Sequence, residues 1–161
     1  MQLKKLTPSF YIDNQTLIQA LDFDMKLGEW MPGKVRGHGI VKISLGDLTF
    51  AIPVHSNIRH DASLILVRNK THPDPRIKGM GLDYAKAMLI KDDTHISDEV
   101  FGLKPRWAIK HLEGKEHHVE KQFTAYVDKY VQAQITNDIY VLNSMEYRFS
   151  TLVNYHTELG L

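Results

Sequence analysis

Two short apolar runs on either side of a turn constrain the fold of this chain more than any other part of its sequence. The runs cover residues 40–45 and 48–52, and Gly46-Asp47 lies between them. Both runs are rich in Ile, Val and Phe, and turn residues between two such runs predict a β-hairpin. A hairpin brings its two ends together, so we expect the residues before the first strand to lie near those after the second.

The open end of this predicted hairpin would gather cationic and imidazole side chains and one hydroxyl group. These residues are Lys34, Arg36 and His38 before the first strand, and His55, Ser56, Arg59 and His60 after the second. No carboxylate follows the second strand until Asp61. Such a set suits a phosphate group better than a metal ion or a cationic ligand.

The charge distribution favours an anionic partner although the net charge is only +1. Residues 34–79 contain eight Lys and Arg against three acidic residues, whereas residues 80–161 contain nine against twelve. This asymmetry predicts an anion-binding face, and a chance fluctuation on a solvated surface is the alternative. Arg76 and Lys78, in a loop predicted at residues 69–81, could reach an RNA backbone or could be ordinary solvated charges.

Length and composition bound the class of protein. A chain of 161 residues is expected to form a single domain, residues 1–161, with a core of its own. It has no cysteine, which excludes disulfides and thiolate metal sites. No stretch is apolar enough to cross a bilayer, and the first residues do not read as a signal peptide. We therefore expect a cytoplasmic protein with no membrane partner.

The other segments predict an α+β fold. Strands are expected at residues 10–12, 62–67, 87–90 and 107–109. Helices are expected from Asp13 or Asn14 to Leu21, as one turn at 96–101, at 116–134 and from Asn143 to about Leu159. Strands gather early and long helices late, which predicts a small curled antiparallel sheet or barrel with helices packed against it.

The histidines and cations at the hairpin suit cleavage of an RNA phosphodiester without a cofactor. Histidine can act as base or acid near neutral pH, and Lys or Arg can stabilise the charge that develops on the phosphate. The alternative for each histidine is a hydrogen-bonded structural role. The chain has no HExxH pattern, although His111 and His117-His118 are present, and no GxSxG elbow or glycine-rich phosphate loop. We therefore expect no metal site.

The hairpin and several later segments resemble the type III toxin–antitoxin toxins, the ToxN/AbiQ group. The hairpin segment is GIVKISLGDLTFAIPVHS at residues 39–56. The continuation is similar to the TenpN branch, in GLDYAKAMLI, ISDEVF, EKQFTAYVDKYV and above all SMEYRFSTLVNYHTELGL at the C-terminus. The resemblance runs from about Lys34 to the last residue, and residues 1–33 match less clearly.

This resemblance implies a compact fold similar to the Kid/MazF toxins and a metal-independent endoribonuclease activity. Such a toxin cuts cellular or phage RNA through a 2′,3′-cyclic phosphate. It is inhibited by a structured, pseudoknot-like antitoxin RNA, which it cuts from a repeat transcript and with which it forms a cyclic assembly. Phage defence is the role attached to the family. Two other readings of the same basic face are a non-catalytic RNA-binding module and a MazF-like ribonuclease neutralised by a protein.

The family's site residues transfer to this sequence only in part. The hydroxyl group at the end of the second strand falls on Ser56, and His55 before it is a departure from the family pattern. The family's lysine before the first strand falls at Lys34 or Arg36, and its second lysine falls near Arg59 and His60.

The polar C-terminal segment also has two interpretations. Arg148, Tyr155 and His156 could bind RNA or line the active site. Alternatively, Tyr155 and His156 are half-buried core residues with internal hydrogen bonds.

Overall fold

The predicted hairpin is present and lies in the middle of the main sheet. The structure, a computed structural model, describes residues 1–33 and 39–161. In it, β4 (Ile40–Leu45) pairs antiparallel with β5 (Leu48–Ile58), and Gly46 at the turn has a φ of 57°, which glycine adopts without steric cost. Lys34, Arg36 and His38 lie outside the described residues.

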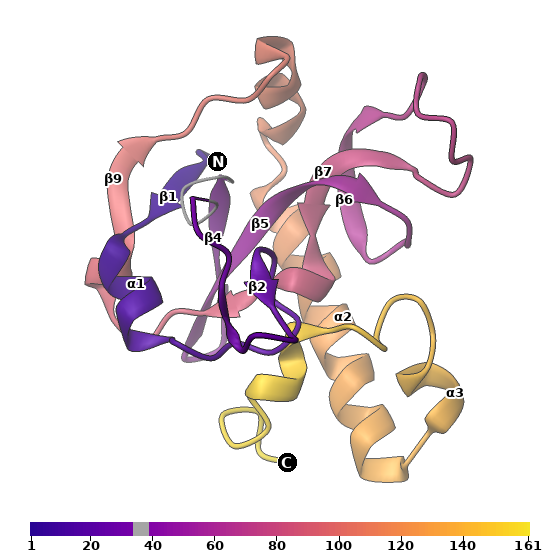
Figure 1. Cartoon of the computed structure of the whole chain (residues 1–161). Helices are drawn as coiled ribbons and strands as arrows, with labels where there is room; N and C mark the ends of the chain where they lie inside the picture. The colour runs from indigo at the N-terminus through magenta and orange to yellow at the C-terminus, as the bar shows by residue number, and fades with distance from the viewer. Residues whose placement is uncertain (34–38) are drawn as a thin grey trace.

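The main sheet has seven strands, and each of its strand pairs in the described ranges is antiparallel. Its order is β6-β7-β5-β4-β1-β9, with β8 paired to β5. The other described strands are β1 (Lys4–Leu6), β2 (Phe23–Asp24), β3 (Glu29–Trp30), β6 (Ser63–Arg68), β7 (Gly79–Asp83), β8 (Met88–Leu89) and β9 (Ile96–Val100). Strands β1 and β9 lie on one side of the molecule and β6 and β7 on the other (Figure 1).

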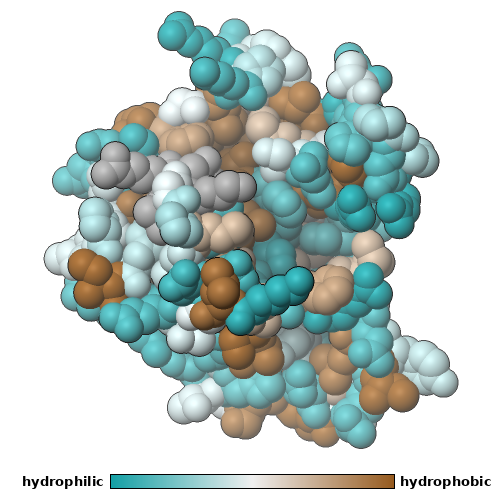
Figure 2. Space-filling view, viewed as in Figure 1, coloured by the Kyte–Doolittle hydropathy of each residue, from teal (hydrophilic) through white to brown (hydrophobic). Residues whose placement is uncertain are grey.

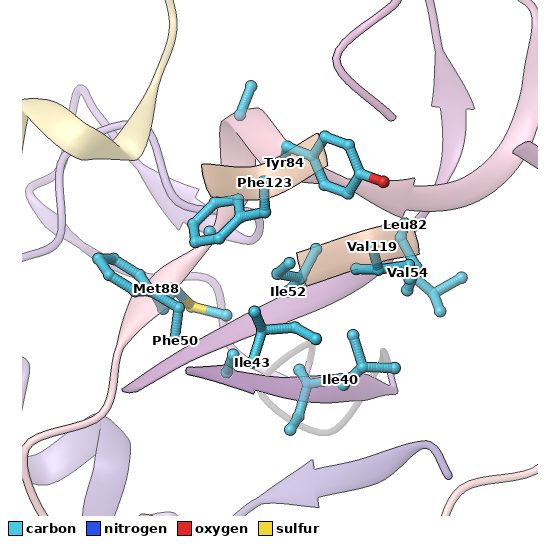
Figure 3. Packing of buried hydrophobic residues seen from close by; sticks show 14 of the residues in the cluster. Ile40, Ile43, Phe50, Ile52, Val54, Leu82, Tyr84, Met88, Val119 and Phe123 are labelled. Carbon is cyan, nitrogen blue, oxygen red and sulfur yellow. The ribbon is translucent and has the colours of Figure 1, made fainter. Parts of the chain in front are cut away.

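One long helix, α2 (Glu116–Thr136), packs against the sheet. The remaining described helices are α1 (Pro8–Asp13), α3 (Ile139–Leu142), and the 3₁₀ segments η1 (Tyr84–Lys86), η2 (Asp93–His95), η3 (Arg106–Leu112) and η4 (Thr151–Asn154). Val119 and Phe123 of α2 are fully buried and face Ile52 and its neighbours on the strands (Figure 3). The Phe123 ring lies 5.2 Å from that of Phe50. The 3.6-residue periodicity of this helix therefore marks its buried face, as its sequence predicts.

The first part of the chain differs from expectation. Residues 10–12, predicted as a strand, belong to α1, which begins with Pro8 at its first position. Proline fits this position because its missing N–H has no helical acceptor there. The helix expected from Asp13 or Asn14 is absent, and the chain instead makes turns in which Gln19 and Asp22 have positive φ.

Several later predictions are also corrected. Residues 96–101 were expected to form a helical turn, but β9 covers most of them and pairs with β1. Residues 107–109 lie in η3 rather than in a strand. The loop predicted at 69–81 ends early, because β7 begins at Gly79. The final helix from Asn143 to Leu159 is absent, and this segment contains only turns and η4. Residues 62–67 and 116–134 match β6 and α2 closely.

The fold class is α+β, with a mostly antiparallel sheet and few helices. The surface over β6, β7 and the loop that joins them is mostly hydrophilic, at the upper right of Figure 2. Across the described ranges, none of the helices has the combined length and apolar character that crossing a membrane requires.

Candidate active site

The C-terminal parts of β5 and β7, with the residues that follow β5, bring two histidines onto one aspartate that is not among the site residues predicted from the sequence. His55 is in register with Gly81 of β7, and Asp83 ends that strand. His55 Nδ1 lies 2.8 Å from Asp83 Oδ2, and His60 Nε2 lies 3.1 Å from Asp83 Oδ1. One carboxylate therefore contacts both imidazoles. We call these three residues the His–Asp–His cluster.

Asp83 is buried, with a side chain only 1% exposed, and it is held by the main chain as well. Its Oδ1 accepts a hydrogen bond from the Ala85 N–H at 3.0 Å, which caps η1. Burial raises the pKa of this carboxyl group, but hydrogen bonds and charge from His55 and His60 outweigh burial and lower the pKa to about 2. Asp83 is thus a fixed carboxylate anion at neutral pH.

His55 is the member of the cluster that can meet a substrate. Its side chain is 30% exposed, and its Nδ1 is occupied by Asp83. Among the described residues, none forms a hydrogen bond with its Nε2. An imidazole that donates Nδ1–H to a carboxylate presents Nε2 as a proton acceptor, and its orientation and tautomer are fixed. This is the geometry of a general base or acid.

His60 lies deeper. Its side chain is 11% exposed, and its Nδ1 is buried without a hydrogen-bond partner in the described part of the chain. Because its Nε2 faces Asp83 and its other nitrogen faces the interior, His60 holds the carboxylate rather than a substrate. The sequence instead predicts that His60, like Arg59, contacts the phosphate groups of a bound RNA.

Ser56 is exposed at an irregularity in the pairing of β5 with β7. Between the pairs His55↔Gly81 and Ile58↔Gly79, β5 contains one residue more than β7. Such a bulge disturbs the ladder and redirects the side chains near it. In the described ranges no side chain or backbone group forms a hydrogen bond with the Ser56 hydroxyl group, which is therefore open to solvent.

The predicted cations near this end of β5 are exposed and paired with acids. Arg59 lies 3.3 Å from Asp74, which also holds Arg76 at 3.0 Å, and Lys78 pairs with Asp61. Exposed pairs of this kind contribute little to stability. A phosphate group could therefore replace the carboxylates at small cost.

The three predicted C-terminal residues do not share one surface. Tyr155 is 4% exposed, and its ring lies 5.9 Å from that of Phe50. His156 Nε2 lies 2.7 Å from the hydroxyl oxygen of Tyr130. Arg148 is exposed and stacks on the Phe149 ring at 4.6 Å. Tyr155 therefore belongs to the core rather than to a surface that RNA could contact.

A cavity of about 620 Å³ is lined in part by residues that directly follow two members of the His–Asp–His cluster in sequence. Its lining includes Asp61, which follows His60, and Tyr84, which follows Asp83, together with residues of α2 and α3. Tyr140 of α3 is among them and is 87% exposed. Within the described ranges, no group of three or more His, Asp or Glu residues has an arrangement that could hold a metal ion.

A glycine pattern in β7 is the sequence signal that could have revealed Asp83. A Cβ atom on Gly79 or Gly81 would lie 2.0 Å from the carbonyl oxygen of Val67 or Leu64, respectively. Glycine inside a strand often marks such a close approach of another backbone. The prediction of a loop at 69–81 assigns the Gly-Met-Gly segment to that loop, whereas the structure places it in β7 with Asp83 at the end of the strand.

Comparisons of the chain with models of protein families, with curated proteins and with solved structures found no match in any of the three.

Proposed function

We propose that the protein is a metal-independent endoribonuclease in which His55 transfers the proton of the reaction. The observation that carries this proposal is the buried, ionised Asp83, which orients the imidazole of His55 through Nδ1, while none of the described residues forms a hydrogen bond with its Nε2. A carboxylate, an oriented imidazole and an exposed nitrogen are the parts that general acid–base catalysis needs.

The reaction is an internal displacement at phosphorus. The 2′-oxygen attacks the adjacent phosphate, forms the 2′,3′-cyclic phosphate, and releases the 5′-oxygen of the next nucleotide as a hydroxyl group. A base must take the proton of the 2′-hydroxyl group, and an acid must give one to the leaving oxygen. His55 Nε2 serves one of these two steps, and Asp83 stabilises the imidazolium ion in either case.

The Ser56 hydroxyl group on β5 and Arg59, directly after β5, are the side chains that we expect to contact the phosphate. Both are exposed, and they follow His55 within four positions. A guanidinium group stabilises the negative charge that develops on the non-bridging oxygens, and the hydroxyl group can donate a further hydrogen bond. Lys34, Arg36 and His38 stay predictions from the sequence.

The resemblance of the hairpin and the C-terminal segment extends the proposal to a biological role. The protein would be a type III toxin with a Kid/MazF-like fold that cuts cellular or phage RNA. A structured repeat RNA, which the toxin itself processes, would inhibit it within a cyclic assembly. Growth arrest on expression of the protein alone, relieved by co-expression of such an RNA, would support this role.

The experiment that tests the proposal compares RNA cleavage by the native protein, His55→Ala and a matched control in the presence of a chelator. His117→Ala is the control, because His117 is exposed on α2 and lies outside the cluster. We expect the native protein and His117→Ala to produce 2′,3′-cyclic phosphate and 5′-hydroxyl ends. His55→Ala should be at least 100-fold slower, the scale of a lost acid or base.

Undiminished cleavage by His55→Ala, with its circular dichroism spectrum unchanged, would show that the site is wrong. Salt-dependent binding of RNA by the native protein without new 5′-hydroxyl ends would instead identify a non-catalytic RNA-binding module.

A further inference from the structure

A second cavity, of about 550 Å³, lies along β6 and is separate from the His–Asp–His cluster. Residues 65–68 of β6 form one wall, Lys70 and Thr71 continue it, and Trp107 and His111 of η3 form the other. We call this cavity the β6–η3 groove. Strand β6 stands at the end of the sheet order, so the groove follows the border of the sheet.

The lining of the β6–η3 groove combines cations with an exposed aromatic ring. It contains Arg68, Lys70 and His111 and no acidic residue. Within the described residues, no carboxylate lies within ion-pair distance of Arg68 or Lys70, in contrast to Arg59 and Lys78 at the other site. These two charges are therefore available to a ligand.

Trp107 is the least expected residue of this lining. It is 51% exposed, although a tryptophan side chain is usually largely buried, and its ring contacts His111 edge-on at a centroid distance of 5.5 Å. The other tryptophan of the chain, Trp30, is partly buried, and its Nε1–H donates to the carbonyl oxygen of Asn14. Packing within the described part of the fold accounts for Trp30 but leaves about half of Trp107 exposed.

Single-stranded RNA is the ligand that uses both features. Its phosphates would meet Arg68 and Lys70, and a base would stack on the indole ring, an interaction worth about 1–3 kcal/mol per base. A small anion would leave Trp107 without a role, and an apolar peptide would leave the two cations without one. Duplex RNA keeps its bases stacked inside the helix and presents none to the indole.

The groove also lies within reach of the proposed active site. Ile65 of β6 is in register with Gly81 of β7, which is in register with His55 of β5. Two strand spacings amount to roughly 10 Å, a distance that a few nucleotides span. A strand bound in the groove could therefore continue to the His–Asp–His cluster.

We propose that the β6–η3 groove binds a single-stranded segment of RNA, with Trp107 stacked on a base and Arg68 and Lys70 on the phosphates. This inference rests on the proposed function. It identifies the substrate as single-stranded RNA, which the groove binds on one side of the scissile phosphate. Removal of Trp107 should then weaken RNA binding without altering the proton-transfer groups.

The test measures binding apart from cleavage, with oligodeoxyuridine, which has no 2′-hydroxyl group and resists the proposed reaction. Addition of the oligonucleotide to the protein should quench Trp107 fluorescence. Fluorescence anisotropy of a labelled oligonucleotide should give the Kd. We expect Trp107→Ala to raise the Kd at least 5-fold, Trp107→Phe to recover part of the loss, and Lys70→Ala to reduce the salt dependence. Lys121→Ala, an equal change of charge on an exposed part of α2, is the matched control and should bind as the native protein does.

A Kd that is unchanged in both Trp107→Ala and Lys70→Ala would overturn the proposal. So would equal affinity for duplex RNA, or displacement of the oligonucleotide by polyglutamate at a lower concentration than by oligouridine. Failure of the groove proposal can be distinguished from failure of the proposed function. If the groove does not bind RNA, cleavage of short RNAs by the native protein can still be measured. A native protein that binds oligodeoxyuridine through Trp107 yet cuts no RNA would retain the groove and lose the nuclease.

Discussion

A single buried carboxylate, that of Asp83, meets three hydrogen-bond donors. Asp83 Oδ2 accepts from His55 at 2.8 Å, and its Oδ1 accepts from the Ala85 N–H at 3.0 Å and contacts His60 Nε2 at 3.1 Å. A buried anion is tolerated when charge-assisted hydrogen bonds replace the water it loses. The same contacts fix the ring of His55, so the packing of Asp83 and the proposed chemistry depend on one another.

Asp83→Asn should show whether the carboxylate orients the His55 imidazole or only fills space. The amide has nearly the same shape but only one acceptor oxygen. One imidazole then loses its acceptor and faces an NH₂ group, and His55 can no longer be held in a single tautomer as part of an ion pair. We expect the kcat/KM for RNA cleavage to fall about 100-fold or more. Asp61→Asn is the control, because Asp61 directly follows His60 but its carboxylate is exposed and pairs with Lys78. It should change the rate less than 3-fold, roughly the effect of an exposed ion pair.

The stability of the protein should depend on the ionisation of Asp83 in acid. Its folded pKa of about 2 lies below the ordinary value of 3.8, so the unfolded chain binds this proton more tightly than the folded one. The contribution, roughly 2 kcal/mol, is therefore complete above about pH 4 and is lost as the pH falls through about 2. Urea denaturation of the native protein and Asp83→Asn over this range should give free energies of unfolding that converge as the pH falls. Parallel curves would contradict this assignment.

At the scale of elements, β7 positions the aspartate and needs glycine to do so. A Cβ atom at Gly81 would lie 2.0 Å from the Leu64 carbonyl oxygen, whereas at Gly102 it would meet no atom within 4 Å. We expect Gly81→Ala to push β7 away from β6, to lower the free energy of unfolding by about 1–3 kcal/mol and to slow cleavage by moving Asp83. Gly102→Ala should be neutral or stabilise by up to about 1 kcal/mol. Equal unfolding curves for the two variants would mean that β7 does not approach β6 this closely.

The elements that the sequence predicts well are those whose determinants are local. The hairpin of β4 and β5 follows from a turn between two branched runs, and α2 follows from its apolar periodicity. Strand β9 does not, because its backbone pairs with β1, at least 90 positions earlier in the chain. The cluster divides in the same way. His55 follows directly from the predicted run at 48–52 and lies in the continuation of the same strand, whereas Asp83 depends on a pairing of β5 with β7 that only the folded chain supplies.

At the scale of the whole molecule, two segments with little secondary structure close on each other. Asn154 accepts a hydrogen bond from the Ile18 N–H and donates one to the Ile18 carbonyl oxygen. Lys86 donates to the carbonyl oxygens of Gln19 and Phe149, and burial lowers its pKa. Backbone groups that no ladder satisfies need such partners. The turns that replace the predicted N-terminal helix are therefore held by the segment that replaces the predicted C-terminal one.

Asn154→Ala should loosen this closure without unfolding the protein, because the sheet and α2 do not depend on it. Two hydrogen bonds to the Ile18 backbone are lost, each worth about 1 kcal/mol, so amides in residues 15–24 should exchange with solvent roughly 30-fold faster. Hydrogen exchange measured by mass spectrometry would show this.

Asn143→Ala, at an exposed asparagine between α3 and the final segment, is the control and should leave the exchange of those amides unchanged. If Asn154→Ala instead accelerated exchange evenly through β4, β5 and α2, the contact would support the whole fold and not this closure. We also expect Asn154→Ala to cleave RNA at the native rate. His55 and Asp83 are held by β5 and β7, so the geometry of the cluster does not depend on this closure.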